Sequence, residues 1–348
     1  MTTRLSFASD YMEGAHPAVL ARLSEENWKS HPGYGTDDLC QSASNRIRAA
    51  CQAPDAAVHF LVGGTQTNAT VIDALLRPWQ GVVASSGGHV STHEAGAIEF
   101  GGHKVLTLPH EKGKITAEAV RACCAAHWGD GNRDHMVEPG MVYLSQPTEY
   151  GTLYSLEELT AVRAVCREYR IPLYVDGARL AYALACPEND VSLSDLARLC
   201  DAFYIGGTKC GLLMGEAVVV PDPALLPRFF TIMKQHGALL AKGWLLGLQF
   251  DALFTDGLYE SVGRPAIEGA AAMRDIFRRY GYRLWLDAPT NQVFVVLENG
   301  QMERLARYLE FSFFEALDES HTVIRLATSW ATRMEDVERI RAVLEAVR

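Results

Sequence analysis

The chain has 348 residues, of which 48% are hydrophobic, and its formal net charge at pH 7 is −10. This length allows one large core and one smaller core, while the acidic balance and the lack of a basic stripe argue against nucleic acid as a partner. The first twenty residues lack the apolar core of a signal peptide, and charge interrupts apolar stretches such as 239–250, so we expect a cytoplasmic protein with no membrane partner.

Strand-like and helix-like segments alternate from about residue 58. Apolar runs predict strands at 58–62, 81–85, 104–108, 141–145, 172–176, 201–205 and 216–220. Helical patterns separate most of these runs, and the clearest helix follows Ser155, where Glu158 completes a capping-box signal. The alternation predicts an α/β fold with a mostly parallel seven-stranded sheet.

After about residue 222 the pattern changes to long helical segments, at 224–255 with a break near Gly237 and at 259–280. Apolar runs at 282–286, 292–297 and 322–328, with a final helix from Met334, predict a smaller C-terminal α+β unit. We therefore divide the chain into three parts: an N-terminal segment, 1–45, that contributes to a dimer interface and to the small domain; a large domain, 46–250; and a small domain, 251–348.

Unusual residues follow several of the predicted strands, at the sheet edge where ligands bind in open parallel sheets. Gly64, Thr65 and Gln66 lie between a strand and a helix, where free backbone amides can receive a phosphate; a tight turn without a ligand has the same pattern. Asp176 ends a strand and Arg179 follows three residues later, which suits either a site or a buried ion pair.

Lys209 follows the next strand, in a segment that is otherwise apolar and rich in glycine. A P-loop is excluded because Cys210 stands where Ser or Thr would bind magnesium, and the glycine spacing is absent. Pyridoxal phosphate needs a lysine for a Schiff base, an acid for its ring nitrogen and an anchor for its phosphate. The glycine-rich turn, Asp176 and Lys209 meet these needs in order, so the sequence predicts this cofactor.

The motifs resemble those of the low-specificity L-threonine aldolases, fold type I pyridoxal-phosphate enzymes of the aromatic amino acid beta-eliminating lyase/threonine aldolase group. The resemblance covers nearly the whole chain. The segments that carry it are 7–11, 32–38, 63–68, 87–104, 146–159, 175–180, 206–211 and 324–330. Its most specific element is the Asp-Gly-Ala-Arg sequence that begins at Asp176, with Lys209 downstream.

The resemblance implies a large cofactor-binding domain of the pyridoxal-phosphate-dependent transferase type, with catalytic roles for residues of this chain. Lys209 would form the Schiff base, and His89 would lie on the face of the cofactor ring. Asp176 would pair with the ring nitrogen, an attraction of roughly 4 kcal/mol at 4 Å and an effective dielectric constant near 20. Such an attraction favours the protonated ring by about three pKa units.

The resemblance also implies the groups that bind substrate and phosphate. Gly64, Thr65 and Gln66 would hold the phosphate. Arg325 would clamp the substrate carboxylate, since a planar fork of donors suits that task. Ser9 and Arg179 would assist near the carboxylate and the phenolic oxygen of the cofactor.

Tyr34 is similar to a residue that reaches the site of a neighbouring subunit in the family. A homodimer or homotetramer follows from this resemblance, and not from composition.

The segment 146–151 departs from the family pattern, because Thr148 or Glu149 stands where many relatives have a histidine. The catalytic base therefore stays open, with His89 and His93 as local candidates because histidine titrates near neutral pH. These two histidines, with Glu94 adjacent, also have metal-like spacing. The sequence offers no third, distant ligand, so we predict no metal.

A second departure lies in segment 234–247, where Trp244 stands in place of an arginine that usually helps to bind the cofactor phosphate. Either Lys242 supplies the cation instead, or cofactor binding or substrate choice differs from that of the relatives.

The implied reaction is cleavage of L-threonine, L-allo-threonine or a related β-hydroxy-α-amino acid to glycine and an aldehyde. The alternative is a β-eliminating lyase or an aminotransferase that acts on another amino acid, because fold and cofactor do not determine which bond at Cα breaks. Substrate preference and stereochemistry at Cβ lie beyond what one sequence reveals.

Overall fold

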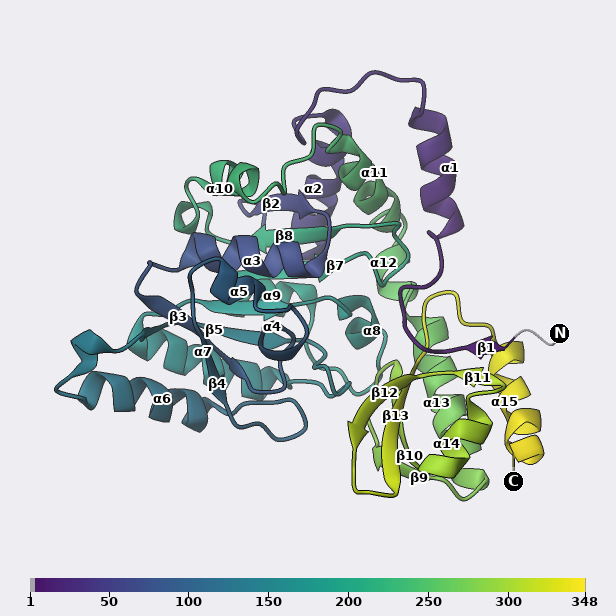
Figure 1. Cartoon of the computed structure of the whole chain (residues 1–348). Helices are drawn as coiled ribbons and strands as arrows, with labels where there is room; N and C mark the ends of the chain where they lie inside the picture. Colours follow the sequence, from purple (N-terminus) through teal and green to yellow (C-terminus); the bar gives the residue numbers. More distant parts are fainter. Residues whose placement is uncertain (1–3, 348) are drawn as a thin grey trace.

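The structure is a computed structural model that describes residues 4–347. A large α/β domain lies beside a smaller domain, to which the strand that begins at Leu5 and the last helix, Met334–Val347, both belong (Figure 1). Within the described residues, no helix combines the length and the apolar character needed to cross a bilayer.

The large domain is built on a seven-stranded sheet. In spatial order its strands are β2 (Ala57–Leu61), β8 (Glu216–Val220), β7 (Ala202–Gly206), β6 (Leu173–Asp176), β5 (Glu138–Ser145), β3 (Gln80–Ser85) and β4 (Val105–Leu108). Strands β7, β6, β5, β3 and β4 run parallel, and β8 is antiparallel to both of its neighbours. The predicted sheet and all seven predicted strands are confirmed, although β5 begins three residues before the predicted strand 141–145.

Both faces of this sheet are buried. Residues of each strand enter two apolar clusters in alternation, as with Val142 and Leu144 on one face of β5 and Met141 and Tyr143 on the other. This is why the strands read as continuous apolar runs. The helices of the domain are α3 (Gly64–Leu75), α4 (His89–Thr92), α5 (Ala97–Phe100), α6 (Ala117–Gly129), α7 (Leu156–Tyr169), α8 (Leu180–Leu184), α9 (Leu193–Leu199) and α10 (Phe229–Gln235).

The capping box predicted at Ser155 is confirmed at the start of α7, where the Ser155 hydroxyl accepts from the Glu158 N–H and the Glu158 carboxylate accepts from the Ser155 N–H. The expected long helix at 224–255 is two helices, α10 and α11 (Trp244–Leu253), separated by a non-helical segment. Gly237, with φ +64°, begins that break as predicted.

Helices α1 (Pro17–Glu26), α2 (Asp38–Ala50) and α11 pack together above the β2 edge of the sheet, beside α12 (Leu258–Ser261) (Figure 1). Gly247 allows α11 to approach α2, because a Cβ atom there would lie only 2.4 Å from Cys40 Sγ. The expected domain boundary at residue 250 falls inside α11, and residues as far as Ile267 pack in the core of the large domain.

The small domain has a four-stranded antiparallel sheet and three helices. Its strands, in spatial order, are β12 (Ser312–Ala316), β13 (His321–Ala327), β10 (Gln292–Glu298) and β9 (Arg283–Leu286). Its helices are α13 (Arg264–Arg279), α14 (Asn299–Leu305) and α15 (Met334–Val347). The three predicted strands and the helix from Met334 are confirmed, whereas β12 and α14 were not predicted.

The start of the chain joins the small domain through a short parallel pair between β1 (Leu5–Ser6) and β11 (Leu309–Glu310). Leu5 and Phe7 belong to the apolar core of that domain. This pairing brings the residues after β1 toward the carboxyl ends of the parallel strands.

Candidate active site

Seven of the twelve predicted site residues line two adjoining cavities. The inner cavity is lined by Gly64, His89, Ser145, Pro147, Glu149, Asp176, Ala178, Arg179, Tyr204 and Lys209. The outer cavity has a volume of about 500 Å³, within the usual range for ligand sites, and its wall includes His93 and Arg325. His89, Glu149, Arg179 and Lys209 border both cavities. Lys209 and Asp176 thus face one space, as the sequence predicts.

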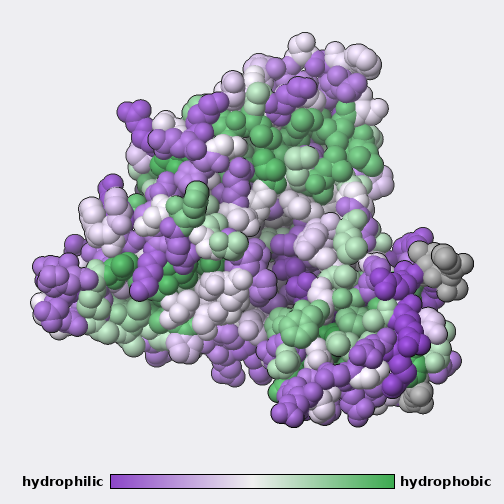
Figure 2. Space-filling view, in the orientation of Figure 1, coloured by the Kyte–Doolittle hydropathy of each residue, from purple (hydrophilic) through white to green (hydrophobic). Residues whose placement is uncertain are grey.

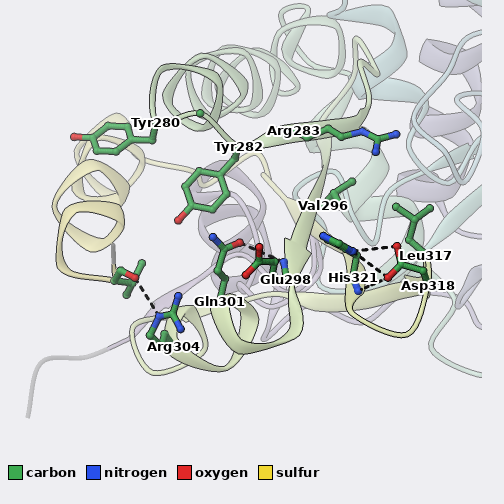
Figure 3. Close-up of a pocket in the computed structure, with 12 residues that line it drawn as sticks. Tyr280, Tyr282, Arg283, Val296, Glu298, Gln301, Arg304, Leu317, Asp318 and His321 are labelled. Carbon is green, nitrogen blue, oxygen red and sulfur yellow. Dashed lines mark hydrogen bonds and ion pairs between the residues drawn. The ribbon is translucent and has the colours of Figure 1, made fainter.

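Another cavity, of about 620 Å³, lies in the small domain between β9, β10 and the turn that joins β12 to β13 (Figure 3). Its polar side chains engage one another or the backbone: His321 Nδ1 lies 3.0 Å from Asp318 Oδ1, and Arg304 Nε donates to the Val347 carbonyl at 3.2 Å. None of the predicted site residues lines this cavity. A large volume alone therefore does not make it the candidate active site.

The site residues of the large domain lie close together because they follow neighbouring parallel strands. Asp176 is the last residue of β6, and Lys209 follows the end of β7 by three residues. His89 begins α4 just after β3, and Glu149 follows β5. Parallel strands deliver these side chains to one edge of the sheet because their carboxyl ends lie together.

The amine of Lys209 has no protein partner. Within residues 4–347, no hydrogen bond or ion pair involves Lys209 Nζ, although its carbonyl accepts a hydrogen bond from the Tyr182 hydroxyl. The residue is only partly exposed and borders both cavities. An amine that is shielded from water and unpaired suits a covalent partner in the cavity.

Asp176 is buried, and neighbouring donors keep it ionised. Its Oδ2 accepts hydrogen bonds from Asn68 Nδ2 at 3.0 Å and from the Tyr143 hydroxyl at 2.7 Å. Burial by itself would raise the pKa of Asp176, but the charge of His89 and hydrogen bonds from Tyr204, Tyr143 and Asn68 outweigh it and lower the pKa. A negative charge is therefore held at the floor of the inner cavity.

Asn68 connects this carboxylate to His89. Its amide also donates to Glu94 Oε1 at 2.7 Å, and the same oxygen lies 2.7 Å from His89 Nδ1. Glu94 is buried, and its Oε2 atom has no partner among the described residues. Sequence analysis missed Asn68, although it stands in the segment 63–68, one helical turn after Gly64.

His93 does not join His89 as a ligand pair. The two rings stack with centroids 5.9 Å apart, and His93 Nδ1 lies 2.6 Å from Thr92 Oγ1. His93 is exposed and borders the outer cavity alone. Burial, and then the charges of His89 and Arg325, lower the pKa of His93.

Arg179 forms an ion pair with Asp10, and not with Asp176. Arg179 Nε and Nη2 donate to the two Asp10 carboxylate oxygens at 2.6 and 3.0 Å, and Asn291 Nδ2 adds a third donor at 2.9 Å. Burial tends to raise the pKa of Asp10, but Arg179 brings it down to about 2. Asp10, which the sequence did not single out, therefore anchors the N-terminal segment to the large domain.

Arg325 borders the outer cavity, and both Arg325 and Ser9 have a buried donor without a partner among the described residues. Arg325 Nη2 makes only long contacts, at 3.4 Å, with the Ala8 carbonyl and Ser312 Oγ. Within the described chain, Arg325 Nε and Ser9 Oγ are buried without hydrogen-bond partners. Buried donors are seldom left unsatisfied, so these two atoms suit an anionic ligand such as a carboxylate.

The glycine-rich turn forms the start of α3, as the phosphate prediction requires. Gly63 caps the helix without a side-chain hydrogen bond, which leaves the first backbone N–H groups of α3 available. Gly64 borders the inner cavity, where a Cβ atom would come within 3.2 Å of the Tyr204 hydroxyl. Thr65 is exposed, and Gln66 Oε1 accepts from the Val62 N–H at 3.3 Å.

Tyr34, Thr65, Gln66 and Lys242, which were predicted to bind the cofactor, do not line either cavity, and the first and last of them lie at other places on the chain. Tyr34 is 43% exposed and borders a separate cavity, with Lys234 Nζ lying 4.7 Å from the centre of its ring. Lys242 is exposed, and Trp244, which replaces the usual arginine, packs its ring 4.8 Å from that of His31. Any contact of Tyr34 or Lys242 with the site requires a second copy of the chain.

Comparison with known proteins agrees with the family resemblance that the sequence motifs indicate. The sequence model of the beta-eliminating lyases matches residues 6–274. The low-specificity L-threonine aldolase of Pseudomonas aeruginosa is 30% identical to this chain, over 98% of the chain and 96% of that protein. A threonine aldolase structure from Leishmania major is 42% identical and superposes with a TM-score of 0.95 over 99% of both chains. Aspartate aminotransferase from Thermus thermophilus, 16% identical with a TM-score of 0.71 over 100% of this chain and 92% of that one, shares the fold.

Glu216, on β8, places a second buried carboxyl group near Lys209. Its Oε2 accepts from the Gly207 N–H at 3.2 Å. Burial raises the pKa of Glu216 to about 8, and the charge of Lys209 and a hydrogen bond from Thr208 only partly oppose that effect. The folded chain therefore retains a proton here that the unfolded chain loses.

Replacement of this carboxyl group should change how stability depends on pH. Glu216 lowers stability progressively as pH rises from its ordinary pKa, 4.5, to about 8, because only the unfolded state releases the proton over that range. Glu216→Gln keeps an oxygen for the Gly207 N–H and cannot titrate. We expect this variant to be more stable than the natural chain at pH 8 by a few kcal/mol at most, since one pKa unit corresponds to about 1.4 kcal/mol.

Urea denaturation of the purified protein at pH 5 and pH 8 measures this effect, and the difference should shrink at pH 5. Glu157→Gln, at an exposed position on α7, is the control for loss of one negative charge. An equal difference at the two pH values would contradict the assignment.

Proposed function

Because the chain belongs to the beta-eliminating lyase family, and within it to the low-specificity L-threonine aldolases, we propose that it is a pyridoxal-phosphate-dependent lyase. Its substrate is L-threonine, L-allo-threonine or a related β-hydroxy-α-amino acid, and its products are glycine and an aldehyde. The observation that carries this proposal is the shared cavity of Lys209 and Asp176, with Arg325, whose Nε lacks a partner among the described residues, on the adjoining wall.

The residues at the inner cavity fit pyridoxal phosphate. Lys209 offers an unpaired amine for the aldehyde carbon, and Asp176 offers a buried carboxylate with a lowered pKa for the ring nitrogen. The free backbone amides at the start of α3 suit the phosphate, and His89, tied to Glu94, would lie against the ring. When bound, this cofactor supplies an electron sink that stabilises negative charge at Cα of an amino acid.

The rest of the site orients the substrate. Arg325 and Ser9 would bind the substrate carboxylate, which satisfies the two buried donors that the chain leaves unpaired. Arg179 borders both cavities, but its charge is already balanced by Asp10, so it would position the ligand and not serve as the main clamp. The small domain thereby holds one end of the substrate while the large domain holds the reacting centre.

The alternative reactions use the same kind of site. A β-eliminating lyase would release ammonia and a keto acid, and an aminotransferase would leave the cofactor in its amine form. The threonine aldolases among the relatives favour carbon–carbon cleavage. Incubation with a panel of β-hydroxy amino acids, with glycine, aldehyde, ammonia and keto acid measured together, separates the three reactions.

Lys209→Ala should remove the visible absorbance of the bound cofactor and lower turnover at least about a hundredfold, because the variant has no amine to join the aldehyde. Absorbance spectra and glycine production from L-threonine measure the two effects. Lys104→Ala, at an exposed position in the large domain, is the control. An unchanged spectrum and rate in Lys209→Ala would falsify the assignment of the site.

Arg325→Gln should raise KM for L-threonine by roughly ten- to a hundredfold, the loss expected for a charge-assisted hydrogen bond of about 1.5–3 kcal/mol. Cofactor absorbance should not change, because Arg325 borders the outer cavity and not the inner one. Steady-state kinetics and a spectral titration with glycine test this. An unaltered KM would show that the substrate carboxylate binds elsewhere.

We also propose that the chain acts as a homodimer or homotetramer. Apolar side chains gather over α11 and the neighbouring helices α1 and α2 (Figure 2), and Trp28, Leu20 and Phe230 are 93%, 48% and 52% exposed. In such an assembly Tyr34 and Lys242 would reach the cavity of a second copy, with Lys242 as the cation for the cofactor phosphate.

Sedimentation equilibrium of the purified protein should give the mass of at least two chains. Lys242→Ala should raise the dissociation constant for pyridoxal phosphate without changing that mass. A fully active monomer would refute the assembly, and unchanged cofactor affinity would refute the role of Lys242.

A further inference from the structure

Glu149 lies where the two cavities meet, and one of its carboxylate oxygens is held in place. Oε1 accepts hydrogen bonds from Ser145 Oγ at 2.6 Å and from the backbone N–H of His89 at 2.9 Å. Oε2 makes no hydrogen bond with another described residue, and it is not among the buried atoms that lack a partner. This oxygen is therefore open to the cavities that Lys209 also borders.

We propose that Glu149 is the general base that takes the proton from the β-hydroxyl group of the substrate during carbon–carbon cleavage. This inference rests on the proposed lyase function. It gives a role to the segment 146–151, in which Thr148 is buried and lies 2.7 Å from Thr152 Oγ1, so that Glu149 is the residue that faces the ligand space.

The two histidines that the sequence offers as bases are less suited to this proton. His89 borders both cavities, but it already engages Glu94 through Nδ1, and the ring of the cofactor would cover its face. His93 is exposed, pairs with Thr92 and borders only the outer cavity. Glu149 is held by two hydrogen bonds, and it lines both the cavity that contains Asp176 and the cavity that contains Arg325.

The surroundings of Glu149 also favour proton acceptance. The titratable and charged groups that face it from neighbouring elements are His89, Tyr143, Tyr150, Tyr154, Asp176, Arg179 and Lys209. Burial raises the pKa of Glu149, and the charge of Asp176 adds to that rise, while hydrogen bonds from Ser145, from the backbone N–H of Glu149 itself and from the His89 N–H oppose it. A carboxylate whose pKa lies nearer neutrality accepts a proton more readily than one in open water.

The step balances without any further reactant. The β-hydroxyl proton passes to Glu149 Oε2, and the electron pair of the O–H bond forms the second bond of the aldehyde carbonyl. The Cα–Cβ bond breaks, and its electron pair remains on Cα. Cα then gains one proton before glycine leaves, so the proton taken from oxygen equals the proton added to carbon.

Glu149→Gln tests the proposal with little change of shape. The glutamine Oε1 atom can still accept from Ser145 and from the His89 N–H, but the side chain cannot take a proton. We expect kcat for L-threonine cleavage to fall about 10²- to 10⁴-fold, the usual contribution of a general base. Exchange of the α-proton of glycine in D₂O, followed by NMR, involves no β-hydroxyl group and should stay within about threefold of the natural rate.

Two further readouts do not depend on turnover. The dissociation constant for glycine, measured by absorbance titration, should be unchanged in Glu149→Gln. Infrared difference spectra of the cofactor-free protein between pH 4 and pH 8 should contain a titrating carboxylic C=O band that is absent in this variant. Glu157→Gln, whose carboxylate is exposed on α7, should keep natural rates and the natural dissociation constant for glycine.

Cleavage within threefold of the natural rate in Glu149→Gln would overturn the proposal. Equal loss of cleavage and of glycine exchange would also overturn it, because it would indicate a structural role. Selective loss of cleavage in His93→Asn, with cleavage retained in Glu149→Gln, would assign the base to His93. If the natural enzyme itself released no glycine from any β-hydroxy amino acid, the proposed function would fail instead.

Discussion

The arrangement of the site depends on keeping one buried carboxylate charged. Asp176 has little contact with water, and an isolated charge in that position would cost several kcal/mol. The structure compensates with donors from separate elements, namely the Tyr143 hydroxyl of β5 and the Asn68 amide of α3. Each donor is itself buried, so the strands around Asp176 must keep their relative positions for the charge to persist. The same Asn68 amide orients Glu94, and through it His89, so the floor and the face of the cavity form one hydrogen-bonded unit.

The small domain and the N-terminal segment add further residues to the candidate site that the parallel sheet forms. β1 pairs with β11, and a few residues later Asp10 binds Arg179 of the large domain. The segment between these contacts presents Ser9, and β13 presents Arg325, so the anion-binding donors come from outside the parallel sheet. A ligand that engages both groups would bridge the two domains, which is why the substrate side of the site needs the whole chain.

Three carboxyl groups near Lys209 differ in pKa. Their different surroundings cause this difference. Asp176 has several donors and a lowered pKa, whereas the partly buried Glu149 and the buried Glu216 have raised pKa values. Sets of titratable groups whose pKa values are pushed apart are typical of catalytic sites, because they allow one residue to hold charge while another exchanges a proton. Lys209, which has no partner in the described chain, stands among them.

The sequence alone determined the parallel sheet, its strands and the residues that follow them. Apolar runs and the capping signal at Ser155 are local, and residues that follow parallel strands must gather at one edge, so Asp176 and Lys209 could be placed together in advance, whereas His89 was added by the family resemblance. Only the tertiary structure decided that Arg179 pairs with Asp10, that Asn68 joins Asp176 to Glu94, and that Glu149 and not Thr148 faces the ligand space. These contacts join residues far apart in the chain or depend on which way one side chain points. Sequence periodicity predicts neither of these, because it indicates which face of a helix or strand is buried and not which residue packs against it.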